Sequence, residues 1–368
     1  MNYNLLLKVS IINFIILSIL GVLLRFIVIY PISFITYKNL KQAHSHLVFN
    51  AVITLFGTIL LIKKFEIEYL YQTKFKYSIV VLIFTAYGML FAFSYQGYKL
   101  VSIIFHKQHT IILLAYKLLL FFLVVSSIAP FCLGYLMKSN LAYSPIYYNT
   151  VYFYLHFQYN GFFIFIIILL VLLNLKKDKD TNKIKLFLYT YASSVILTYT
   201  ISLLWHNANP IKYTISFIGS ALQCISIYFL FQTSKFSFAN TYKNKNYLLL
   251  FITLCYIAKL VMQLIISIPL FSHSFITNRN IIIAFLHLTL IGVVWLSFYY
   301  NATKHIKQWN YHIFVFCIIF ITTEVLLFIS SILPIQNIAN YLFYTSIFFP
   351  ISLVGIYKHS TKNALDKI

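Results

Sequence analysis

Five histidines lie inside hydrophobic stretches of this chain, and each is close to one end of its stretch. They are His44, His46, His156, His206 and His287. An imidazole at membrane depth is costly unless it has a partner or a function. Two imidazoles from facing helices can hold a heme iron from both sides. The pattern therefore predicts a metal or heme site, provided that these segment ends face the same side of the membrane.

The elements that carry these histidines must be membrane helices. The chain has 368 residues, of which 61% are hydrophobic and 9% are charged. This composition predicts an all-α polytopic transmembrane helical bundle in contact with the lipid bilayer, with residues 1–368 as a single transmembrane domain. The net charge of +22 comes largely from short lysine clusters between apolar segments. Such clusters are typical of cytoplasmic loops, and they do not indicate a nucleic-acid partner.

The number of helices follows from length and charge together. Eleven apolar segments are visible, but the fourth would cover roughly 99–137, far more than the ~20 residues that a span needs. A break near Lys117 divides it into spans over 99–116 and 118–137 and raises the total to about twelve helices. With twelve helices and both termini in the cytoplasm, most lysines and arginines fall on the cytoplasmic side, as the positive-inside rule requires.

This topology places all five histidines in the outer half of the membrane. His156 and His287 lie about two helical turns, ~10 Å, below the outer boundary. Tyr152, His156 and Asn160 share one helix face by their spacing of four residues, and Tyr199 and His206, which are seven residues apart, share one face of the next helix. His156 and His206 could hold a copper or iron ion, or they could belong to a polar network.

Two charged residues fall within spans and need a partner there. Glu324 is the only carboxylate in any predicted span, and Lys259 lies in the middle of another. Since each charge would be costly alone, we predict that the two form a pair, with a proton-relay role as the alternative. The four cysteines form no CxxC or CxxCH motif, which argues against a disulfide framework and a covalently attached heme.

At these histidines the chain resembles subunit I of the heme–copper oxidase superfamily, and most of all the C-type (cbb) oxidases and nitric oxide reductases. The stretch Gln42–Leu47 (QAHSHL) resembles the R-x-L-H-T-N segment of that family. The resemblance implies that His44 binds a low-spin heme, with His46 at the asparagine position and as the alternate ligand. The stretch Ala284–His287 (AFLH) is similar to the G-H-V-H motif. It implies that His287 is the second ligand of the low-spin heme.

Other motifs of the family are depleted in this chain. Residues 154–161 (YLHFQYNG) are similar to the V-H-L-W-V-E-G run, which maps His156 to the non-heme metal. Thr198-Tyr199 followed by Trp205-His206 resembles the T-Y…H-H segment, so Tyr199 matches the catalytic redox tyrosine and only His206 remains of the histidine pair. Phe285 stands at the position of the high-spin heme ligand.

The resemblance implies a heme-binding integral membrane protein of a prokaryotic inner (cytoplasmic) membrane. It would transfer electrons through a bis-histidine low-spin heme b and would retain a degenerate catalytic centre. A cytochrome or another electron-transfer subunit would be its partner. The alternatives are an active terminal oxidase or nitric oxide reductase, a heme-dependent oxidoreductase that keeps copper or non-heme iron, and a secondary transporter without a cofactor.

Overall fold

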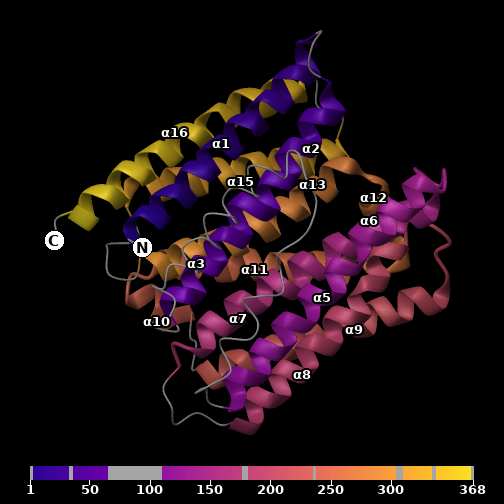
Figure 1. Ribbon diagram of the computed structural model, residues 1–368, viewed down its shortest axis with the longest axis horizontal. Helices are drawn as coiled ribbons and strands as arrows, with labels where there is room; N and C mark the ends of the chain where they lie inside the picture. Colours follow the sequence, from indigo (N-terminus) through magenta and orange to yellow (C-terminus); the bar gives the residue numbers. More distant parts are fainter. Residues whose placement is uncertain are drawn as a thin grey trace. The chain divides into compact units, whose positions relative to one another are not determined.

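The computed structural model of the chain is helical throughout the residues that it describes (Figure 1). The described residues are 3–32, 36–64, 110–175, 181–234, 238–303, 310–333 and 337–365. Ten helices within them are long and apolar enough to cross a membrane. This confirms the predicted multi-pass helical membrane protein. The predicted spans that start near residue 77 and at residue 99 lie in the gap after residue 64, almost wholly outside the described residues, so the total of twelve stays a prediction.

The helices group into two compact units. Unit 1 comprises Met1–Gln96 and Trp295–Ile368, and unit 2 comprises Gly97–Val294. Each unit is described below by itself. The prediction of one transmembrane domain over residues 1–368 stays a prediction.

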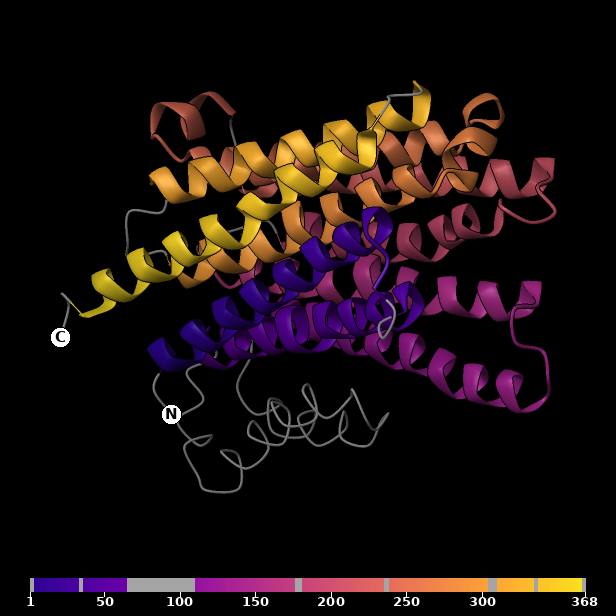
Figure 2. The same ribbon diagram turned by 90° about the horizontal axis from the view of Figure 1, so that it is seen from above.

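Unit 1 is built from helices at the two ends of the chain. Helix α1 (Tyr3–Ile29) packs beside α16 (Ile338–Leu365), and α16 also packs on α15 (Tyr311–Ile332), as Figures 1 and 2 show. Three consecutive segments form a second span against α1: α2 (Tyr37–Leu47), η1 (Val48–Thr54) and α3 (Leu55–Lys64). Helix α14 (Leu296–Ala302) contacts α3.

The core of unit 1 is aromatic. The ring of Trp295 lies 4.4 Å from that of Phe14 on α1 and 5.4 Å from that of Phe316 on α15. All three side chains are buried. Aromatic rings in such contacts bury large apolar areas, so these three side chains join α1 and α15 around the start of α14.

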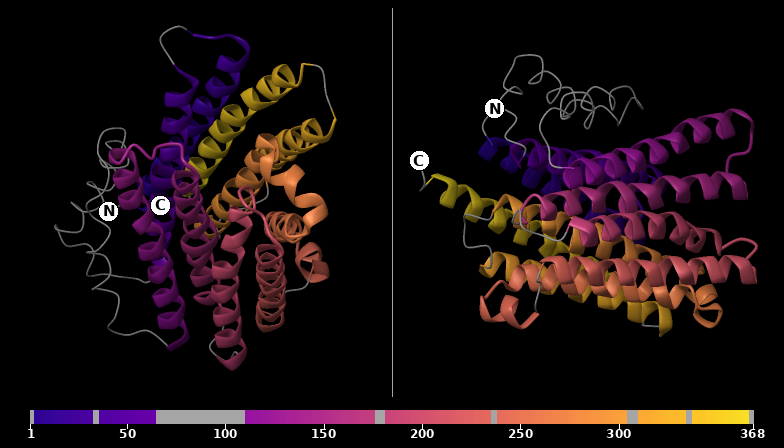
Figure 3. Two further views of the ribbon diagram at one scale, coloured as in Figure 1. Left: turned by 90° about the vertical axis from the view of Figure 1, so that its right-hand side faces the viewer. Right: turned by 90° about the horizontal axis from the view of Figure 1, so that it is seen from below.

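Unit 2 is a set of antiparallel hairpins that continue through further short helices. Helix α5 (Thr110–Lys138) turns back into α6, and α8 turns back into α9 (Figure 3). The remaining elements, in chain order, are α6 (Pro145–His156), η4 (Phe157–Phe163), α7 (Ile164–Leu172), α8 (Thr181–Thr198), η5 (Tyr199–Leu203), α9 (Pro210–Ser234), α10 (Phe238–Lys243), α11 (Tyr247–Ile266), α12 (Pro269–Thr277), α13 (Arg279–His287) and η6 (Leu288–Trp295).

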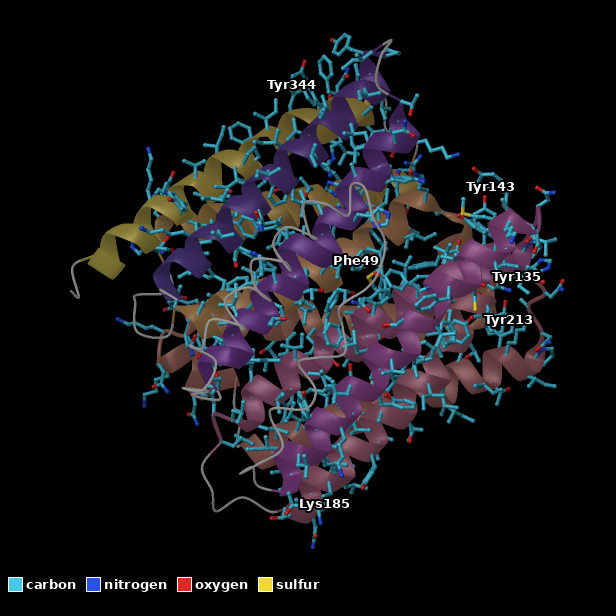
Figure 4. The ribbon with its side chains drawn as sticks, viewed as in Figure 1. Phe49, Tyr135, Tyr143, Lys185, Tyr213 and Tyr344 are labelled. Atoms are coloured by element: carbon cyan, nitrogen blue, oxygen red, sulfur yellow. The ribbon has the colours of Figure 1, made fainter. Side chains whose placement is uncertain are left out.

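The ends of unit 2 differ in composition. Tyr135 near the end of α5, Tyr143 before α6 and Tyr213 near the start of α9 lie at one end of the unit, and Lys185 lies at the opposite end (Figure 4). Tyrosine is enriched at both membrane interfaces, so these residues do not show which side of the membrane each end faces. The orientation of unit 2 stays a prediction.

Helix α6 begins earlier than the apolar pattern predicts, because its start is set by capping residues. Ser144 accepts a hydrogen bond from the Tyr147 backbone N–H at 3.3 Å, and Pro145 occupies the first helical position. Both are strong signals for a helix N-terminus. The helix therefore starts four residues before the expected position near residue 149, and His156 lies ~16 Å from its beginning.

The predicted break near Lys117 is wrong. Helix α5 runs without interruption from Thr110 to Lys138 and includes Lys117 in its third turn. The residues around Lys117 are good helix formers, and the side chain of Lys117 is exposed. A helix of this length measures ~43 Å, more than the ~30 Å hydrocarbon core, so a lysine near its start can reach the interface without ending the helix.

Candidate functional site

The histidines selected from the sequence coincide with places where helices lose α-geometry. The π-helix η1 begins at Val48, four residues after His44 and two after His46. The π-helix η4 begins directly after His156, and η6 begins directly after His287. π-Helical turns are rare and occur frequently at functional sites. The π-helical turns therefore lie in three of the four helices that the histidine pattern selects.

The fourth of these helices changes geometry at the predicted catalytic tyrosine. Helix α8 ends at Thr198, and the chain continues as the 3-10 helix η5 from Tyr199 to Leu203. His206 follows in a turn outside the helix. The expectation that Tyr199 and His206 share one helix face is wrong, because the α-helical spacing does not extend to His206.

His44 in unit 1 lies against a glycine of α1. A Cβ atom added to Gly21 would meet the His44 Cε1 atom at 3.3 Å, which is closer than an ordinary van der Waals contact. The absence of a side chain at Gly21 therefore makes room for this imidazole. Both His44 and the alternate ligand His46 are half-buried near the end of α2. The contact with Gly21 favours His44 over His46 as the ligand, because the atoms nearest to the Cβ position of Gly21 belong to His44.

His156 is fully enclosed in unit 2, and both of its ring nitrogens have protein partners. Its Nε2 atom lies 2.8 Å from the Val195 carbonyl oxygen of α8. Because a carbonyl can only accept, Nε2 carries the proton and donates it. Nδ1 then accepts from the Asn160 side-chain amide at 3.2 Å. An imidazole bound in this way has no nitrogen lone pair left for a metal ion.

Tyr199 is brought next to His156, as the resemblance implies. The two ring centroids are 5.7 Å apart, and Phe157 packs against both rings. The Tyr199 hydroxyl donates to the Asn149 carbonyl oxygen at 3.3 Å. The ring of Tyr199 therefore lies beside the imidazole, while its hydroxyl is tied to the beginning of α6.

His206 is held at a different level from His156. Trp205 donates its indole N–H to the Asn149 side-chain oxygen at 2.9 Å, and the His206 ring lies 5.3 Å from the Trp205 ring. Asn149 precedes His156 by seven residues, which corresponds to ~10 Å along a helix. The described residues include no group of three or more histidine, cysteine or acidic side chains that could hold a metal ion. Copper or non-heme iron at His156 and His206 does not fit this arrangement.

His287 ends α13 in unit 2 and is half-buried. Two residues earlier, the ring of Phe285 lies 6.2 Å from that of Tyr159, which is part of the buried segment η4. The position that corresponds to a high-spin heme ligand is therefore occupied by a ring in aromatic contact. No heme can be bound by this side chain.

The intramembrane charges have different surroundings. In unit 1, Arg25 donates to the Leu342 carbonyl oxygen at 2.8 Å and is close enough to Glu324 for an electrostatic interaction. In unit 2, Lys259 is fully buried and lies 5.5 Å from the centroid of the Tyr256 ring. The predicted pairing of Lys259 with Glu324 stays a prediction. Arg25, which the sequence analysis did not pair, is the charged neighbour of Glu324 within unit 1.

A polar seam between α9 and α11 was not singled out from the sequence. Ser220 of α9 lies 3.1 Å from Ser267, the residue that follows α11, and both hydroxyls are buried. Gln223 and Gln263 are buried on the same two helices. Spacing does contain a signal for this seam, because Ser220 and Gln223 are three residues apart and Lys259 and Gln263 are four apart.

No protein-family model matches the chain, and no curated protein sequence matches it.

Proposed function

We propose that this chain is an integral membrane protein that binds a low-spin b-type heme through His44 and His287 and transfers electrons. The observation that carries the proposal is the position of both histidines beside π-helical turns, at η1 and η6. Both turns lie next to a motif histidine that is half-buried, which supports a functional role for the two helices. The third such turn, η4, lies next to His156, which differs because it is buried and has both nitrogens occupied.

The surroundings of the histidines support His44 as a heme ligand and His156 as a structural residue. The imidazole of His44 lies in the space left by the missing side chain of Gly21, so Gly21 positions this candidate ligand. His156, in contrast, is saturated by Val195 and Asn160. The half-buried histidines are therefore better ligand candidates than the fully buried one.

His44 and His287 would hold the heme, which would supply one-electron transfer and would leave no position for oxygen or nitric oxide. Phe285 at the high-spin ligand position and the occupied nitrogens of His156 disfavour a retained oxidase or nitric oxide reductase activity. We further propose a prokaryotic inner membrane with both termini cytoplasmic, and a cytochrome or another electron-transfer subunit as the partner.

The test is optical spectroscopy of the purified protein, expressed with heme supplementation. We expect a Soret band and a sharp α-band in the reduced-minus-oxidised spectrum, with no response to carbon monoxide. No Soret band would refute the proposal and would favour the cofactor-free transporter. A band that responds to carbon monoxide would indicate an open iron position and would favour the oxidoreductase alternative.

Variants assign the ligands. His44→Ala and His287→Ala should each abolish the low-spin bands, whereas His46→Ala and His273→Ala should retain them. Gly21→Leu should lower the heme content because the new side chain displaces His44. Gly134→Leu is the matched control, since a Cβ atom at Gly134 meets nothing within 4 Å. Retention of the bands in His44→Ala with loss in His46→Ala would transfer the ligand to His46.

A further inference from the structure

The polar seam between α9 and α11 contains a buried lysine whose Nζ atom has no hydrogen-bond acceptor. Lys259 is 0% exposed, and its Nζ atom has no hydrogen-bond partner. The Tyr256 ring at 5.5 Å gives it a cation–π contact near the outer limit of that interaction. Such a contact favours the ammonium form but leaves its three N–H donors unsatisfied. A buried ammonium without acceptors is destabilised, because it has lost its hydration and has gained no partner in the protein.

No carboxylate of unit 2 can supply the missing charge within the described residues. The only acids between residues 97 and 294 are Asp178 and Asp180, which lie outside the described residues, in the stretch between α7 and α8. The helices that surround Lys259 in unit 2 therefore contain no acidic side chain. The nearby ionisable group on α9 is the Cys224 thiol, which is close enough for an electrostatic interaction with Lys259.

Two buried amides on these helices are incompletely satisfied. Gln223 precedes Cys224 and is 0% exposed; it interacts with the Tyr191 hydroxyl, but neither of its amide atoms has a hydrogen bond of ordinary distance and angle. Gln263 lies one turn after Lys259 on α11, is 3% exposed, and has an unpartnered side-chain oxygen. Buried amides are rarely left in this state in proteins. A group that accepts from Lys259 and Gln223, together with a water that donates to the amide oxygens, would satisfy all three.

The neighbouring hydroxyl groups are paired with each other and supply no charge. The Tyr191 and Tyr256 hydroxyls are 3.4 Å apart, and the Ser220 and Ser267 hydroxyls are 3.1 Å apart. One lysine can balance one negative charge. We infer that the α9–α11 seam binds a small monovalent anion, of the size of chloride or formate, against Lys259 and Gln223.

A row of hydroxyl groups runs along α9 from its N-terminal end toward Gln223. Thr200 of η5 lies 2.7 Å from Ser216 near the start of α9, and Ser220 follows one turn later. Gln223 is the next polar residue on this face. Hydroxyls along one helix face would be the successive partners of a partly hydrated anion that enters from the end of unit 2 where α9 begins.

The inference is tested on the purified full-length protein in detergent, with gluconate as the only other anion at constant ionic strength. Chloride, and separately formate, is titrated while the melting temperature and the binding of radiolabelled chloride are measured. We expect a saturable rise in melting temperature and binding of one chloride per chain that formate displaces. This result is expected with or without heme, so it is independent of the heme proposal.

Matched variants assign the anion to the seam. Lys259→Met should abolish chloride binding, and Gln223→Leu should weaken it at least tenfold. Lys183→Met, which removes an exposed lysine at the start of α8, should bind like the wild type. Equal chloride binding by Lys259→Met and the wild type would overturn the inference. If Lys259→Met does not fold, the absence of saturable chloride binding by the wild-type protein, or full binding by Gln223→Leu, would overturn it as well.

Discussion

The histidines of this chain differ in what their ring nitrogens touch, and this difference governs what each one can do. His156 donates to a carbonyl and accepts from an amide, so its imidazole joins η4 to α8. His44 lies in a space left by a glycine, and His206 lies on the face of Trp205. A buried imidazole with two protein partners stabilises the fold, while a half-buried one next to a small residue is better placed for a ligand.

His156→Ala should destabilise the protein by about 1–3 kcal/mol, because the Val195 carbonyl and the Asn160 amide lose their partner in a buried position. His206→Ala should change stability by less than about 0.5 kcal/mol, since that side chain is half-buried and has one weak polar contact at 3.4 Å. Thermal unfolding of both variants in detergent measures the difference.

Metal removal tests whether His156 binds a metal ion instead of stabilising the fold through its protein partners. A chelator of copper and iron should leave the melting temperature of the wild type unchanged. If the chelator lowered the melting temperature of the wild type and had no effect on His156→Ala, His156 would be a metal ligand and its assignment to the fold would be wrong.

The elements of unit 2 approach each other closely through glycines. A Cβ atom on Gly219 of α9 would meet the Leu197 Cβ at 2.7 Å and the Thr198 backbone nitrogen at 2.9 Å. A Cβ atom on Gly161 of η4 would meet the Phe122 ring of α5 at 2.7 Å. Small residues that let backbones approach are typical of helix interfaces in membranes. Gly219 therefore holds α9 against the last turn of α8, directly before the 3-10 helix that carries Tyr199.

Gly219→Ala should destabilise the protein by about 1–3 kcal/mol, because backbone atoms of α8 must move to accept the new methyl group. Gly134→Ala is the matched control on α5. Nothing lies within 4 Å of its Cβ position, so it should stabilise the helix by up to about 1 kcal/mol through the higher helix propensity of alanine. Equal melting temperatures for the two variants would show that the α8–α9 contact is not close.

At the scale of the whole molecule, the two units combine distant parts of the sequence in different ways. Unit 1 joins the first and last segments of the chain, through the contact of α1 with α16. Unit 2 is continuous in sequence and is built from neighbouring hairpins. The turn between α5 and α6 and the start of α8 lie at opposite ends of unit 2, so they should be exposed on opposite sides of the membrane.

Cysteine labelling tests this arrangement. In a background without the four native cysteines, Ser139→Cys should react with a membrane-impermeant maleimide in intact cells. Lys183→Cys should react only after the cells are permeabilised, because the positive-inside rule places the lysine-rich end in the cytoplasm. Reaction of both positions from one side would contradict the hairpin topology, and a reversal of the two sides would contradict the predicted orientation.

The class of the protein could be predicted from the sequence because hydrophobicity over about 20 residues is a local property. The multi-pass helical architecture and the proximity of Tyr152, His156 and Asn160 in the chain required nothing more than length and helical period. Helix ends were predicted less well. The continuity of α5 through Lys117 and the start of α6 at Pro145 depend on the total helix length and on capping, which the apolar pattern does not contain.

What required the folded arrangement is the pairing of polar groups between helices. The sequence places His156, Lys259 and Gln223 within membrane segments, but it does not state which neighbour each one meets. The packing of η4 on α8 satisfies His156, and the packing of α9 beside α11 leaves the Lys259 Nζ atom without a hydrogen-bond acceptor. The cost of burying a polar group depends on whether a partner from another element is within reach, and only the packing of the helices determines that.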